Sequence, residues 1–60
     1  MKEETLRGIL HDWEYMLPIY EESLRNSTTV ANIEHYKHMV EFSKRQIQET
    51  EEALQQFKTA

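Results

Sequence analysis

The chain has 60 residues, with seven Lys and Arg against eleven Asp and Glu, so its formal net charge is −4. A single core of this size rarely supplies more than ~3–5 kcal/mol, and small folds add disulfides, a metal or self-association. Cysteine is absent, which excludes disulfides and thiolate zinc sites and leaves self-association as the remaining support. The acidic balance argues against a nucleic-acid partner and against an anionic membrane surface.

The apolar residues are scattered along the chain rather than gathered into one long run. No run approaches the ~20 consecutive apolar residues that span a bilayer. The sequence begins Met1, Lys2, Glu3, Glu4, whereas a secretory signal has a basic segment followed by an apolar one. We therefore expect a cytoplasmic protein with no membrane segment, in which residues 1–60 form a single helical-hairpin domain.

The first predicted helix spans residues 3–26 and carries two rows of apolar residues. The first row follows steps of three and four and consists of Leu6, Ile9, Trp13, Met16 and Tyr20. The second row recurs every seven residues and consists of Leu10, Leu17 and Leu24. Together the rows form a face wider than the seam of a simple coiled coil, so one partner helix cannot cover it.

Pro18 interrupts this helix, because a proline removes the hydrogen bond to the carbonyl four residues earlier. Ending the helix at Leu17 is the alternative, but the residues before Pro18 are poor N-caps for a new helix. The apolar rows also continue past Pro18 in the same phase, and Pro18 itself falls on the outer face. We therefore predict one continuous helix, kinked at Pro18, with Asn26 as a left-handed cap at its end.

The second predicted helix spans residues 29–58 and follows a short polar segment. Its core row repeats every 3.5 residues on average, and it consists of Ile33, Tyr36, Val40, Ser43, Ile47, Thr50, Leu54 and Phe57. This is the period of a helix packed lengthwise against another helix. An antiparallel hairpin that turns near residue 28 brings the two apolar faces together. In this register Trp13 lies over Ser43, whose hydroxyl can accept a hydrogen bond from the indole N–H.

Several apolar residues find no partner inside this hairpin, namely Leu10, Leu17, Leu24, Leu54 and Phe57. Leaving a leucine side chain in water forfeits ~1.5–3 kcal/mol. A second hairpin packed against the first recovers this burial. We therefore predict an all-α antiparallel two-helix hairpin that dimerises into a four-helix bundle.

Three residues of the second helix, His35, His38 and Glu41, have the spacing of metal ligands on a helix. They fall on its outer face, whereas metal sites in helix bundles use inward-facing residues, so three solvated side chains are the favoured interpretation. The sequence has no nucleophile motif and no pocket-forming loops. We therefore expect no enzyme activity, no metal and no cofactor.

Large residues outside the core rows are the candidates for a partner-binding surface, namely Tyr15, Ile19 and Phe42. A contiguous exposed set marks a binding site, whereas scattered residues need no function. An acidic cluster, Glu49, Glu51 and Glu52, is either a solvated face or a docking surface for a basic partner. The basic residues Lys37, Lys44 and Arg45 either form salt bridges beside the seam or make a ridge that meets RNA.

The lead interpretation is a non-catalytic protein-interaction module, a small regulator or adaptor that acts as a homodimer and binds another protein. The alternative is an RNA-binding four-helix bundle, and a metal-binding or enzymatic role ranks third. The layout is similar to that of the small plasmid copy-number regulator that binds paired RNA loops. This resemblance is one of architecture, without a shared motif, so it implies no RNA-binding residue in this chain.

Overall fold

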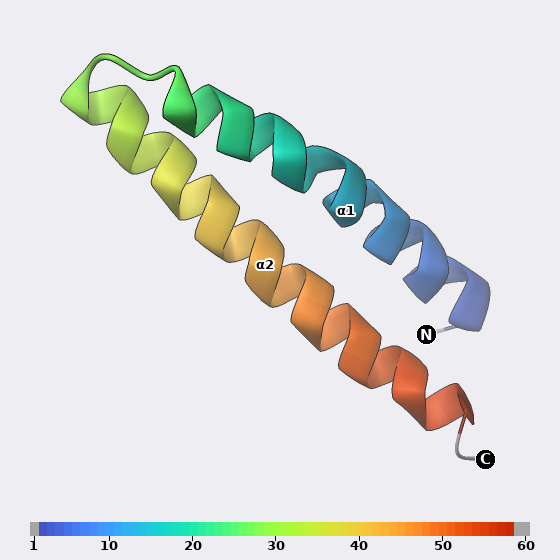
Figure 1. Cartoon of the computed structure of the whole chain (residues 1–60). Helices are drawn as coiled ribbons and strands as arrows, with labels where there is room; N and C mark the ends of the chain where they lie inside the picture. Colours follow the sequence, from blue (N-terminus) through green and yellow to red (C-terminus); the bar gives the residue numbers. More distant parts are fainter. Residues whose placement is uncertain (1, 59–60) are drawn as a thin grey trace.

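The computed structural model describes residues 2–58, which form a hairpin of two long antiparallel helices (Figure 1). Helix α1 spans Glu3–Arg25 and helix α2 spans Val30–Lys58. The helices lie side by side over their whole length, and the hairpin measures 48 × 14 × 14 Å. The predicted all-α hairpin is therefore confirmed, with observed helix bounds within one residue of the predicted ones.

Helix α1 runs through Pro18 without a break, as predicted. Proline has no N–H, so the carbonyl of Glu14 loses its partner within the helix. Pro18 lies on the exposed side of α1. Water can therefore reach this carbonyl, which is why the proline is compatible with one continuous helix.

The turn between the helices differs from the prediction at Asn26. Asn26 has φ −90° and ψ 0°, so it is right-handed and not the predicted left-handed cap. Its backbone N–H donates to the Glu22 carbonyl at 3.1 Å, and its side-chain amide donates to the Glu22 carboxylate at 3.3 Å. These two bonds continue the helical path by one residue. The chain then restarts at Thr29, whose hydroxyl accepts the backbone N–H of Asn32 at 3.2 Å and caps α2.

The seam between the helices contains small polar residues as well as apolar ones. Leu6 of α1 and Val40, Ser43 and Thr50 of α2 are each less than a tenth exposed, and Ser43 is wholly buried. The Ser43 hydroxyl donates to the Met39 carbonyl and the Thr50 hydroxyl to the Gln46 carbonyl, both at 2.7 Å. Each polar group is thus satisfied within α2, so its burial leaves no unmade hydrogen bond.

Trp13 of α1 is half-buried and contacts α2 through Phe42, the neighbour of Ser43 in sequence. Its ring meets Phe42 edge to face, with 5.4 Å between centroids and 73° between planes. The predicted hydrogen bond from the indole to Ser43 is therefore replaced by an aromatic contact. The Ser43 hydroxyl bonds within its own helix, to the Met39 carbonyl, so its burial does not depend on a bond from the indole.

The single hairpin has very little apolar core. Among residues 2–58, Leu6 and Val40 are the only large apolar residues less than a tenth exposed. The chain exposes 4729 Å², against about 4,200 Å² for a compact monomer of its mass. A single hairpin therefore buries apolar surface only along the seam between its two helices.

Candidate functional site

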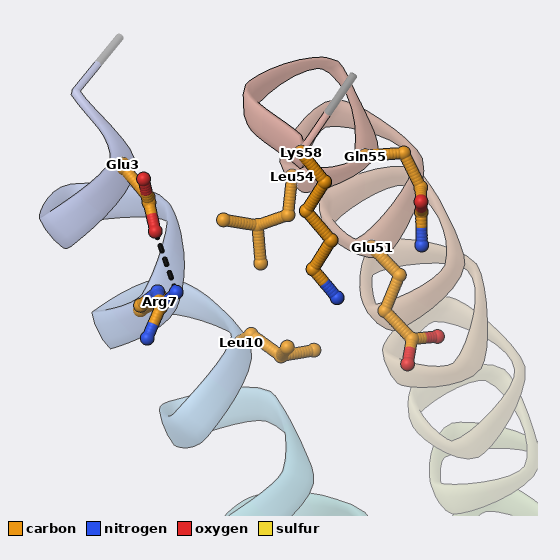
Figure 2. Close-up of a pocket in the computed structure, with 7 residues that line it drawn as sticks. All are labelled: Glu3, Arg7, Leu10, Glu51, Leu54, Gln55 and Lys58. Carbon is orange, nitrogen blue, oxygen red and sulfur yellow. Dashed lines mark ion pairs between the residues drawn. The ribbon is translucent and has the colours of Figure 1, made fainter. Parts of the chain in front are cut away.

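One side of the seam carries the leucine flank, which we define as Leu10, Leu17, Leu24 and Leu54. All four side chains are half-buried. Leu10 of α1 and Leu54 of α2 point toward each other across a groove of about 320 Å³ (Figure 2). Leu54 therefore faces α1 and does not extend freely past it, whereas Phe57, further along α2, is 43% exposed.

Charged residues surround this groove. On α1, Arg7 pairs with Glu3 at 2.5 Å, and on α2 Glu51 and Lys58 complete the rim (Figure 2). The other ion pair of the described helices joins Arg25 to Glu22, and the bonds from Arg25 and Asn26 hold the pKa of the Glu22 carboxyl below its usual range. These exposed pairs join neighbours on one helix, so they stabilise α1 slightly and do not tie it to α2.

The other side of the seam carries a second groove, of about 290 Å³, which lies on α1 alone. We call it the aromatic groove and define it by its lining residues, Ile9, Asp12, Trp13, Met16 and Tyr20. Successive residues of a helix are about 100° apart, which places these residues across the seam from Leu10 and Leu17. The leucine flank and the aromatic groove are therefore separate surfaces.

Two rings of α2 support the edge of the aromatic groove. Phe42 meets the edge of Trp13, and the imidazole of His38 stacks on Phe42, with 6.2 Å between centroids and 23° between planes. Phe42 itself is half-buried. Phe42 thus holds the indole in place, which gives it a packing role beside its predicted place on a partner surface.

The six residues predicted for a partner surface do not form one patch. Tyr15 and Ile19 are 65% and 42% exposed, and the three glutamates of the acidic cluster are also exposed. Glu51 lines the groove of the leucine flank, whereas Phe42 contacts Trp13 on the opposite side. Tyr15 and Ile19 follow the aromatic groove around α1, on the side away from the seam. The set is therefore divided between two sides of the hairpin.

His35 and the basic residues Lys37, Lys44 and Arg45 lie outside the two grooves. His35 packs edge-on against Tyr36, with 5.0 Å between centroids. No three His, Asp or Glu side chains within residues 2–58 come together to hold a metal. Lys37, Lys44 and Arg45 are exposed and make no ion pair with the described acidic residues, so the predicted salt bridges beside the seam are not present.

Sequence reasoning assigned Ile9, Met16 and Tyr20 to the core and missed that they line an open groove. The signal was the width of the apolar face of α1, which one neighbouring helix cannot cover. Neither α1 nor α2 is apolar enough over a sufficient length to cross a membrane. Comparisons with protein-family models, with curated proteins and with solved structures gave no match, so the inference of function rests on this chain's own residues.

Proposed function

We propose that the protein is a non-catalytic interaction module that acts as a homodimer, in which two hairpins pack through their leucine flanks into a four-helix bundle. The observation that carries this proposal is the near absence of a core in one hairpin. Only two large apolar residues of the described chain are less than a tenth exposed, while the leucine flank stays half-buried. Covering that flank moves the remaining leucine surface out of water.

The size of the hairpin supports a second copy as the cover. Its long face measures 48 × 14 Å, on the order of 700 Å², close to the ~800 Å² per partner of a specific interface. Each fully buried leucine contributes ~1.5–3 kcal/mol. The four leucines of the flank are already half-buried, so dimerisation adds only a part of this energy for each leucine in each copy. This gain is comparable to the whole core energy of a small single domain, ~3–5 kcal/mol.

Sedimentation at micromolar concentration tests the homodimer, with Leu17→Glu as the disruptive variant. Wild type sediments as a dimer, and Leu17→Glu as a monomer, because a carboxylate buried without a partner costs several kcal/mol. His11→Glu is the matched control, since it adds the same charge at an exposed position of the same helix. A wild-type chain that stays folded and monomeric at every concentration contradicts the proposal, and so does a Leu17→Glu variant that still dimerises.

RNA binding is the second candidate, favoured by one observation. Lys37, Lys44 and Arg45 lie on the exposed surface of α2 without ion pairs to described acids. The net charge of −4 opposes this role. A salt titration separates the two functions. Affinity for RNA falls steeply with salt when phosphates are contacted, whereas an association through buried leucines changes little in affinity with salt.

A further inference from the structure

The aromatic groove has the dimensions of a site for a helix. Ile9, Trp13, Met16 and Tyr20 follow one another at steps of four, three and four. At about 1.5 Å per residue, this row extends over roughly 16 Å, or three helical turns. Its side chains are half-buried and its tryptophan is held in place by Phe42. Large, pre-positioned apolar and aromatic side chains in a row are what an amphipathic helix uses as its docking groove.

The charges around the groove favour a partner of positive charge. Asp12 is the only charged residue that lines it. Helix α1 carries six acidic and two basic residues, a net charge of −4 with His11 neutral. Both basic residues are engaged, Arg7 with Glu3 and Arg25 with Glu22, while Asp12 has no ion pair within residues 2–58. The groove therefore presents unneutralised negative charge beside apolar surface.

A second copy of this chain does not supply the complementary charge. Helix α2 carries five acidic and four basic residues, a net charge of −1, so neither helix of the chain is cationic. The leucine flank, on the other side of the seam, is the surface assigned to self-association. A dimer formed there leaves the aromatic groove free for a different chain.

From this geometry we infer that the aromatic groove is the docking site for a basic amphipathic helix of another protein. The inference rests on the proposed interaction function and names the class of its partner. Apolar side chains of the incoming helix lie along Trp13 and Met16, and its Lys or Arg side chains reach Asp12. Tyr15 and Ile19, exposed on the adjacent surface of α1, extend the contact. Such opposite charges speed association and fix the orientation of the docked helix.

The single tryptophan of the chain is a built-in reporter, because Trp13 lines the groove. The probe is a synthetic helical peptide of about 18 residues, made of leucine on one face and lysine on the other. Its binding shifts the Trp13 emission to shorter wavelength and saturates. A peptide with the same leucines but with glutamate for lysine is the matched control, and it produces no shift.

Two charge reversals on α1 locate the binding. Asp12→Lys places a cation in the groove, and it weakens binding of the basic peptide at least about tenfold, as like charges in an interface do. Glu14→Lys makes the same change of charge on the leucine side of the helix, and it changes the affinity less than about threefold. Both residues are exposed, and far-ultraviolet circular dichroism verifies that both variants stay helical.

Three results overturn the inference. If the two charge reversals weaken binding of the basic peptide equally, the peptide is attracted to the acidic helix as a whole and not to the groove. If the acidic peptide binds as tightly as the basic one, the charge of the partner does not determine binding. Loss of the dimer in an Ile19→Arg variant means that a second copy occupies this side. The outcomes stay separate from those for the homodimer, since sedimentation is measured on the same samples. A dimer that binds no peptide overturns only the groove, and a monomer that binds it overturns only the dimer.

Discussion

Ser43 is the most deeply buried of the described residues. It is wholly buried, and its hydroxyl is satisfied by the Met39 carbonyl of its own helix at 2.7 Å. A small residue with its polar group satisfied locally lets two helix backbones come close without a buried unmade bond. The same arrangement recurs one heptad later at Thr50, whose hydroxyl donates to Gln46. Packing of the seam at Ser43 and Thr50 therefore depends on side-chain size more than on apolarity.

Replacing Ser43 tests this role directly. Ser43→Leu destabilises the fold by about 1–3 kcal/mol, because the added carbons enter a space that is already filled. Ser43→Ala is the control, and it stays within about 1 kcal/mol of wild type because it removes one locally bonded hydroxyl and adds no volume. Denaturant unfolding curves measure both differences. A Ser43→Leu protein more stable than wild type shows that the helices do not approach closely here.

Trp13 shows what the heptad pattern leaves open at the residue scale. The pattern correctly placed Trp13 near the level of Ser43, since Phe42, its actual neighbour, is adjacent to Ser43 in sequence. It did not determine which side chain of α2 the ring contacts. That contact depends on the rotamers of both rings and on the space between the packed helices. The contact between Trp13 and Phe42 was therefore not predictable from spacing alone.

At the scale of elements, the 3.5-residue repeat determined most of the fold. The buried residues of α2, Val40, Ser43 and Thr50, all belong to the predicted core row. The end of α1 was predicted less well, because Asn26 accommodates left-handed or right-handed backbone and the bonds to Glu22 select the latter. The open groove on α1 was not predicted, because the apolar row on α1 was assumed to be covered by α2.

The start of α2 depends on one side chain. The Thr29 hydroxyl accepts the N–H of Asn32 at 3.2 Å, which satisfies one of the free donors of the first turn. Thr29→Ala therefore costs about 1 kcal/mol, the usual value of an N-cap. Thr28→Ala, one residue earlier and outside the helix, is the matched control and changes stability by less than about 0.5 kcal/mol. Equal effects of the two substitutions in thermal unfolding contradict the capping role.

At the scale of the whole molecule, the hairpin is a rod of 48 × 14 × 14 Å with two unlike flanks. The leucine flank is suited to a second copy, because the face is large enough for a dimer interface and its centre is aliphatic. The aromatic groove is suited to a cationic partner, because Asp12 lies in it and α1 is strongly acidic. A chain of 60 residues can in this way separate self-association from partner binding on opposite sides of one seam.

The proposed homodimer predicts that the stability of the protein depends on its concentration. If the dimer is the folded form, tenfold dilution removes about 1.4 kcal/mol from its stability. With an unfolding entropy of about 2.1 cal/mol/K per residue, a dimer of this chain then loses about 6 °C of Tm for each tenfold dilution. His11→Glu keeps this dependence, since His11 is exposed and outside the leucine flank. Thermal unfolding followed by circular dichroism over a hundredfold range of concentration measures it, and a Tm that stays constant for wild type shows that one hairpin folds without its second copy.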